Sequence, residues 1–127
     1  MELNQEELER TVALLTSTIA KCEKMQQKFT EGSSRHSLLK NRIKALQISK
    51  ALLTNDPSAD YTSRELRDAL PPVQSIIHKT TKAQRKYEQG SPKYNQFEPL
   101  IRAMENSKAC IEGKIMEGAA QPEQRSP

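Results

Sequence analysis

The sequence is poor in the residues that build disulfide-rich or aromatic cores. Its 127 residues include no tryptophan, two cysteines, three tyrosines and two phenylalanines. Two cysteines cannot form a disulfide framework, which indicates a reduced, cytoplasmic protein. No stretch approaches the roughly 18 consecutive apolar residues of a membrane span, and the acidic start has no secretory signal. We therefore expect neither a membrane protein nor a secreted one.

The sequence also has few residues arranged for catalysis or metal binding. Its two histidines, His36 and His78, have no metal-ligand spacing to Cys22 or Cys110. Both cysteines occupy apolar helical positions that are typical of small core residues. There is no phosphate-binding glycine loop, no nucleophile elbow and no Glu-x-x-His pair. We therefore expect no metal site, no cofactor and no catalytic residue.

The chain does contain an internal repeat. A shift of 58 residues aligns residues 7–53 with 65–111 without a gap and gives 15 identities in 47 positions. Unrelated sequences of ordinary composition would match at roughly one position in fifteen. We infer a duplication, with one repeat at about 4–54 and the other at about 62–112.

Both repeats begin with the signature of a helix N-terminus. An Asn or Thr is followed three positions later by glutamate, in Asn4-x-x-Glu7 and Thr62-x-x-Glu65, as in a capping box. Apolar residues then recur at spacings of four and three, which predicts a helix with one buried stripe. The stripe positions are Leu8, Val12, Leu15, Ile19, Cys22 and Phe29, and in the second repeat Leu66, Leu70, Val73, Ile77, Thr80 and Tyr87.

A short turn separates the two helices expected in each repeat. Gly32 and Gly90 suit the positive φ of a helix C-terminus, and the serine after each glycine is a favoured N-cap. We predict an all-α fold, a four-helix bundle built from two tandem hairpins, because one hairpin alone would bury too little surface. The expected helices span about 5–30, 34–54, 63–89 and 93–116.

Prolines distinguish the second repeat from the first. Pro71 and Pro72 should kink or break the third helix, and Pro99 should bend the fourth unless that helix starts late. The expected domain covers residues 1–117. The polar segment 118–127 contains two prolines and is expected to be a disordered tail. The apolar content of only 35% leaves a homodimer open.

Four polar residues interrupt the apolar stripes at matched positions. Gln26 and Gln84 are expected to fix helix register, the alternative being contact with a ligand inside the bundle. Lys50 and Lys108 lie near a helix C-terminus, where the helix dipole favours a cation, and we expect their ammonium groups to reach solvent. A third hypothesis, an enzyme, would require a polar cleft between the hairpins that contains one of these lysines.

Basic residues form the strongest polar pattern. Residues 19–50 hold eight basic and two acidic side chains, and residues 77–108 hold seven and three. These windows therefore carry +10, and the rest of the chain carries −6, within a net charge of +4. The lysines recur at matched positions, on a helix face well away from the apolar stripe. The candidate partner-binding residues are Lys21, Lys24, Lys28, Lys79, Lys82, Arg85 and Lys86.

These basic faces support two hypotheses of function. The first is a non-enzymatic interaction or regulatory module that presents basic helix faces to an acidic protein partner. The alternative is a nucleic-acid-binding accessory protein that contacts phosphates without reading bases. No helix-turn-helix, zinc-finger or RNP signature is present to support base-specific contacts. Both hypotheses compete with a basic surface that is merely solvated.

Overall fold

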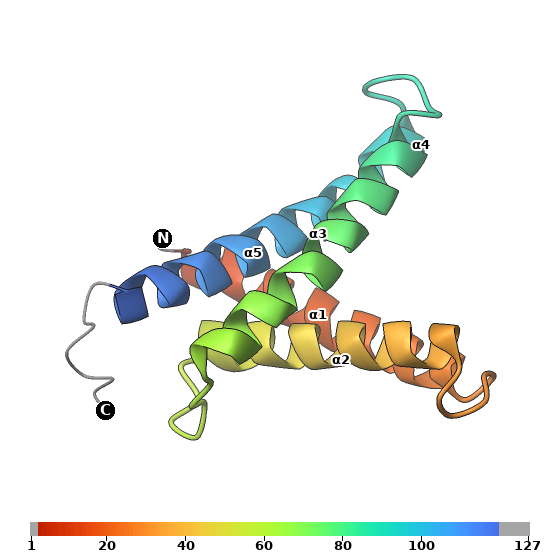
Figure 1. Ribbon diagram of the computed structural model, residues 1–127. Helices are drawn as coiled ribbons and strands as arrows, with labels where there is room; N and C mark the ends of the chain where they lie inside the picture. The colour runs from red at the N-terminus through yellow and green to blue at the C-terminus, as the bar shows by residue number, and fades with distance from the viewer. Residues whose placement is uncertain (1–2, 120–127) are drawn as a thin grey trace, which may run out of the picture.

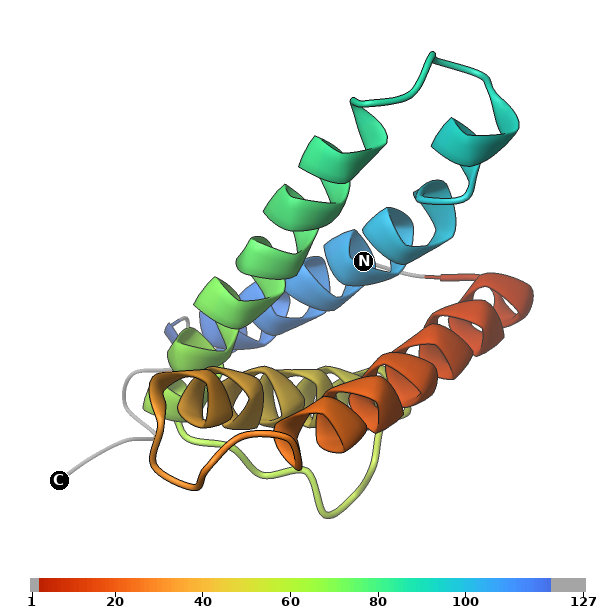
Figure 2. The same cartoon turned by 90° about the vertical axis from the view of Figure 1, so that its right-hand side faces the viewer.

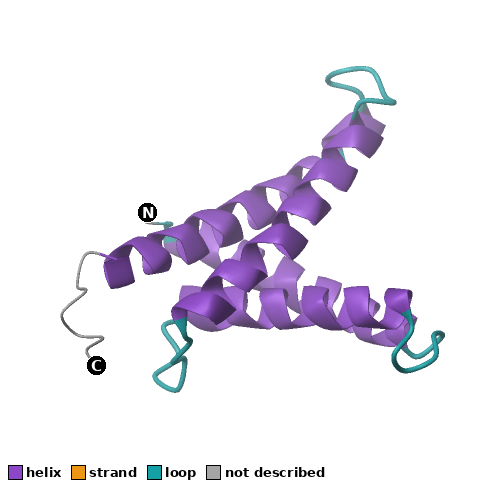
Figure 3. Cartoon of the chain, in the orientation of Figure 1, coloured by secondary structure: helices purple, strands orange, loops and turns teal. Residues whose placement is uncertain are grey.

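Helices form most of the described chain. The computed structural model describes residues 3–119, and this part of the chain contains no strand (Figure 1, Figure 3). The predicted all-α class is confirmed, and the helices pack against one another as in a bundle. The elements are α1 (Gln5–Gln26), α2 (Ser34–Leu53), α3 (Ser63–Gln84), the one-turn α4 (Pro92–Asn95) and α5 (Glu98–Ala119).

Side-chain oxygens cap the starts of the first four helices. Asn4, Ser33, Thr62 and Ser91 each accept a hydrogen bond from the backbone N–H three residues later. At Thr62 the capping box is complete, because the Thr62 N–H donates in return to Glu65 Oε1 at 3.0 Å. In the first repeat Asn4 caps α1, but among the described residues its N–H makes no return bond to the Glu7 side chain, so the capping box is incomplete.

Helices α1 and α3 end earlier than the sequence predicts, at Gln26 and Gln84 instead of near residues 30 and 89. The backbone tightens beyond these ends. The N–H groups of Lys28 and Lys86 donate to the carbonyl three residues back, at 3.0 and 3.2 Å, in place of the carbonyl four residues back. Lys28 and Lys86 therefore lie in turns just after the helices. The prediction that each lies on a helix face together with the two lysines before it was wrong.

The predicted break of the third helix at Pro71 and Pro72 does not occur, because α3 continues through both prolines. A proline removes the bond from its own nitrogen to the carbonyl four residues back. Here the carbonyls concerned belong to Arg67 and Asp68, which are exposed, so water can take the place of the missing donor. The predicted kink at the same place stays a prediction.

The fourth expected helix is divided into α4 and α5. Because α5 begins at Glu98, Pro99 lies in its first turn, where the missing N–H breaks no helical bond. Helix α5 continues to Ala119, beyond its expected end near residue 116 and into the segment predicted as a tail. The rest of that segment, 120–127, lies outside the described residues. None of the described helices has the length and apolar character needed to cross a membrane.

The long helices pair as two hairpins, α1 with α2 and α3 with α5. The hairpins cross where α2 contacts α3 and α5, and where α1 contacts α5. Beyond the crossing the hairpins diverge, so that the turns at residues 27–33 and 85–91 lie at separate ends, both on the right-hand side of Figure 1 (Figure 1, Figure 2). A single core joins the hairpins, and its fully buried residues include Leu15, Leu46, Val73, Met104 and Ile111.

Ion pairs between the hairpins occur at positions 58 residues apart. Lys44 Nζ of α2 lies 3.4 Å from Glu65 Oε2 of α3. Arg102 Nη1 of α5 lies 3.4 Å from Glu7 Oε2 of α1. Each hairpin therefore contributes the same two positions to the crossing, as the two subunits of a symmetric dimer do at an isologous interface.

Small residues occupy matched buried positions on α2 and α5. Ala45 and Ala103 are each 1% exposed, and Ser49 and Ser107 are fully buried. Each serine Oγ donates to the alanine carbonyl four residues earlier in its own helix, at 2.9 Å. Because the hydroxyls need no partner in another helix, these small side chains permit close packing in the core.

Candidate functional site

The candidate basic residues form two separate groups, one at the tip of each hairpin. We call residues 21–35 the first basic tip and residues 79–93 the second basic tip. The tips diverge from the crossing (Figure 1, Figure 2), so the two groups lie at the ends of different hairpins. All seven side chains predicted as partner-binding are exposed, namely Lys21, Lys24, Lys28, Lys79, Lys82, Arg85 and Lys86.

None of these seven side chains forms an ion pair or hydrogen bond within residues 3–119. The five ion pairs in that range use other cations, three within single helices and two between the hairpins. The tips therefore keep a positive charge that no neighbouring carboxylate neutralises by direct contact. Such a surface attracts anionic groups of a partner.

Each tip also holds a cation against an aromatic ring. Arg35 Cζ lies 5.7 Å from the centroid of Phe29, and Lys93 Nζ lies 6.0 Å from the centroid of Tyr87. Both contacts join the turn to the start of the next helix. Arg35 and Lys93 were not among the candidate residues predicted from the sequence, although a cation and a ring recur at these positions 58 residues apart.

The two tips differ in charge. The first basic tip contains four basic residues against Glu23 and Glu31, so its formal charge is +2. The second contains five basic residues against Glu88 alone, so its formal charge is +4. The second basic tip therefore offers the stronger attraction to an acidic partner.

The matched glutamines connect the two helices of each hairpin. Gln26 Nε2 donates to the backbone oxygen of His36 at 3.3 Å, and Gln84 Nε2 donates to that of Tyr94 at 3.1 Å. Gln84 also donates to Glu98 Oε1 at 2.8 Å. Each glutamine thus joins the end of one helix to the first turn of the next, which is consistent with the expected role in register.

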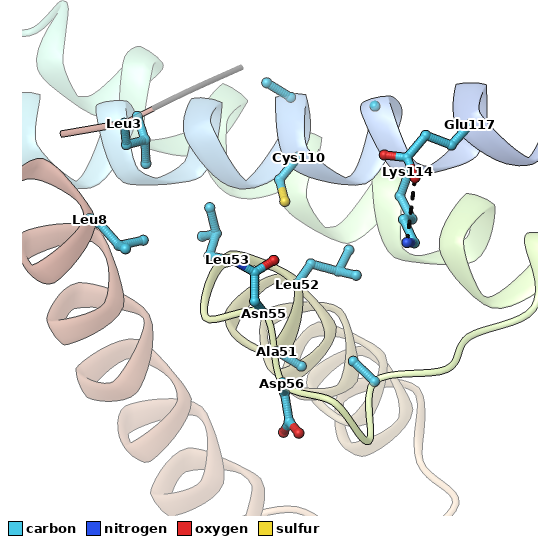
Figure 4. A pocket seen from close by; sticks show the side chains of 13 residues that line it. Leu3, Leu8, Ala51, Leu52, Leu53, Asn55, Asp56, Cys110, Lys114 and Glu117 are labelled. Carbon is cyan, nitrogen blue, oxygen red and sulfur yellow. Dashed lines mark ion pairs between the residues drawn. The ribbon is translucent and has the colours of Figure 1, made fainter. Parts of the chain in front are cut away.

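A groove of about 610 Å³ lies between the C-terminal halves of α2 and α5 (Figure 4). Leu8 and Leu52 line it, and the Cys110 sulfur points into it. Lys114 Nζ and Glu117 Oε1 form an ion pair of 3.5 Å at one end. The two repeats contribute matched positions to this groove, because Leu52 and Cys110 are 58 residues apart.

The retained lysines do not belong to this groove. Lys50 and Lys108 are half-buried, and neither lines the groove between α2 and α5. Among the described residues, neither forms an ion pair. The structure therefore does not bring either lysine into this groove.

The thiols show no sign of activation. Burial raises the pKa of Cys22 and of Cys110, which favours the protonated form at neutral pH. Within residues 3–119, no three His, Cys, Asp or Glu side chains are grouped so that they could hold a metal ion.

No family model, curated protein or solved structure matches the chain. Its function is therefore inferred from the arrangement of its own residues, among which the two exposed and unpaired basic tips are the most distinctive.

Proposed function

We propose that this chain is a non-enzymatic interaction module whose two basic tips bind acidic protein surfaces. One observation carries the proposal. Every ion pair among the described residues uses a cation outside the tips, whereas the seven candidate cations at the tips are exposed and have no such pair. Exposed and unpaired cations can meet the carboxylates of a partner without first breaking internal contacts.

Arg35 supports the proposal independently. It is the second residue of α2, whose first turn contains no acidic residue. The start of a helix carries a partial positive charge, so a cation there is disfavoured by about 0.3–1 kcal/mol. Lys24 and Lys82, in contrast, lie in last helical turns, where the dipole favours them. The helix dipole therefore does not favour the cation at Arg35. Its contact with the Phe29 ring holds it at the tip, where it adds to the exposed positive charge.

The alternative function uses the same cations to contact nucleic-acid phosphates. Base stacking would require open aromatic faces at the tips. Phe29 and Tyr87 each face a cation, and Tyr87 also stacks on Phe97 with centroids 5.9 Å apart. These contacts engage faces of both rings, which argues against base stacking at the tips and leaves contact by charge.

We also infer that the hairpins arose by duplication and associate about an approximate two-fold axis. The sequence identities support this inference. Contacts that recur 58 residues apart support it as well: the ion pairs between the hairpins, the cation–ring pairs and the glutamine hydrogen bonds. A duplication explains why the basic tip occurs twice.

The proposal is tested by the binding of a fluorescent, helical peptide of about twenty residues rich in glutamate, followed by anisotropy at low salt. Neutralising two lysines in each tip should weaken binding about tenfold or more. A matched control neutralises four exposed cations outside the tips and should bind nearly as the wild type does. The tip variant changes Lys24, Lys28, Lys82 and Lys86 to Gln, and the control changes Arg10, Arg64, Arg67 and Lys114 to Gln.

Equal binding by the tip variant and the control would contradict the proposal. A random duplex DNA of about twenty base pairs is measured in parallel. If the DNA binds more tightly than the peptide and loses affinity in the tip variant, the nucleic-acid alternative is favoured instead. Circular dichroism melts confirm that both variants are folded.

A further inference from the structure

We infer that the two basic tips are separate binding sites, so that one chain bridges two acidic protein segments. The inference rests on the proposed function, because it takes acidic protein as the partner of each tip. Beyond the proposed function, we infer that there are two sites, that they bind independently, and that they fill in a definite order.

Each tip is complete without the other hairpin. Its cations, its ring-supported cation and its glutamine hydrogen bond all come from one hairpin. The first tip even has a small core of its own, in which Cys22, Leu39 and Ile43 pack apart from the shared core. A partner segment can therefore bind one tip without any contact from the opposite hairpin.

The crossing of the hairpins keeps the tips apart. Two ion pairs, Lys44 with Glu65 and Arg102 with Glu7, join the hairpins at the crossing together with the shared core. The turns at residues 27–33 and 85–91 extend from this crossing in different directions (Figure 1, Figure 2). Helices of 22 residues, such as α1 and α3, are about 33 Å long. Each tip therefore lies at the outer end of its own hairpin.

The charges predict the order of filling. The second basic tip carries +4 and the first carries +2. A given acidic segment should therefore occupy the second tip at lower concentration, and the first tip only as more is added. Both steps should weaken as salt is raised, because the cations are exposed and screened.

Stoichiometry tests the inference directly. The full chain is titrated with the glutamate-rich peptide by calorimetry at low salt, and we expect two peptides per chain. Neutralising one tip should leave one peptide per chain, and the site that remains should be the weaker one when the second tip is neutralised. The variants change Lys21, Lys24 and Lys28, or Lys79, Lys82 and Lys86, to Gln, and the control changes Arg10, Arg64 and Lys114 to Gln.

Bridging is tested by energy transfer between two batches of the peptide, one carrying a donor dye and the other an acceptor. The wild type and the control should give transfer that is lost when unlabelled peptide is added in excess. Each single-tip variant should bind peptide and give no transfer. Together with the stoichiometry, this result shows two peptides on one chain.

The possible failures are distinguishable. If the wild type does not bind the peptide at all, the proposed function fails, and the bridging inference fails with it. If one peptide binds and only one tip matters, bridging is overturned and the proposed function stands. If one peptide binds and either tip variant abolishes binding, the tips form one extended site, which also overturns bridging.

Discussion

The two hairpins bury small residues alike at their crossing and differ in charge and in hydrogen bonding at their tips. At the crossing, Ala45 and Ala103 are each 1% exposed, and Leu46 and Met104 are fully buried. At the tips, Gln84 is 5% exposed and makes two hydrogen bonds, whereas Gln26 is half-buried and makes one.

The two-fold relation that we infer between the hairpins accounts for this difference. The ion pairs follow this relation, because Lys44 with Glu65 and Arg102 with Glu7 use the same two positions of each hairpin. A change there must therefore fit two contacts at once. A tip position contacts only its own hairpin and the solvent. The tips can therefore differ in charge and in hydrogen bonding without disturbing the contact between the hairpins.

The largest expected effect is at the crossing, where the two hairpins should respond alike. Leu46 and Met104 are matched and fully buried. Leu46→Ala and Met104→Ala should each lower the free energy of unfolding by about 2–5 kcal/mol, because each leaves a cavity in the shared core. Urea denaturation measures both. A loss of less than about 1 kcal/mol in one variant alone would show that the core is not shared equally.

The glutamines should separate the two tips. Gln84→Leu removes two hydrogen bonds of a buried side chain and should cost about 1–2 kcal/mol. Gln26→Leu removes one longer bond of a half-buried side chain and should cost about 0.5–1 kcal/mol. The same urea titration gives both values. If Gln26→Leu proved the more costly, the second tip could not be the more firmly held of the two.

A smaller change in the free energy of unfolding is expected at one crossing position where the hairpins differ. Asn106 Nδ2 donates to Thr11 Oγ1 at 3.2 Å, and the matched residues Ile48 and Ala69 are buried and apolar. Thr11→Ala should cost about 1 kcal/mol, because Asn106 loses its partner. Adding Asn106→Ile should recover that loss, because it recreates the apolar pair of the other half.

A double-mutant cycle provides the measurement for this position. The two substitutions should couple by about 1 kcal/mol. Additive losses would mean that the two halves of the crossing do not have equivalent environments. That result would weaken the two-fold relation inferred for the hairpins.

Much of the fold could be predicted from spacing alone. The apolar stripe correctly identified Leu15 as a core residue, and the repeat placed Leu46 and Met104 at equivalent positions. The stripe missed Thr11 and Ala69, which are each 3% exposed, because they face the other hairpin instead of their own partner helix. Periodicity shows which face of a helix is buried but not which helix covers it.

The candidate site could be predicted only in part, again because periodicity describes single helices and not how they pack together. Exposure of the lysines within α1 and α3 follows from the helical pattern, whereas Lys28 and Lys86 lie in turns. The separation of the tips depends on how the hairpins cross, which local spacing does not encode. The helix ends were misplaced because Gly32 and Gly90 have positive φ in the turns and not at the last helical residue. Helices α1 and α3 end earlier because the backbone changes to hydrogen bonds with the carbonyl three residues back. Side-chain identity does not reveal this change.

The smallest expected effect concerns the helix starts, where the second repeat has a complete capping box. The hydrogen bond from the Thr62 N–H lowers the pKa of Glu65, and Lys44 lowers it further. Because the pKa is lower in the folded state, the Glu65 carboxylate stabilises the fold above its unfolded pKa, and this contribution is lost as the pH falls through the folded pKa. As the pH is lowered from about 6 to 3, the melting temperature of the wild type should therefore fall more steeply than the melting temperature of the Glu65→Gln variant.

Glu7→Gln is the matched control for this comparison. It removes an ion pair of the same kind but no bond to a cap N–H, since the first repeat forms its cap without a reciprocal bond. The difference between the two variants in the pH dependence of melting, followed by circular dichroism, therefore isolates the capping box. If Glu65→Gln and Glu7→Gln flatten the profile equally, the reciprocal bond adds nothing, and the helix starts do not distinguish the two repeats. A steeper change for Glu65→Gln would extend the asymmetry of the hairpins from their tips to the start of α3.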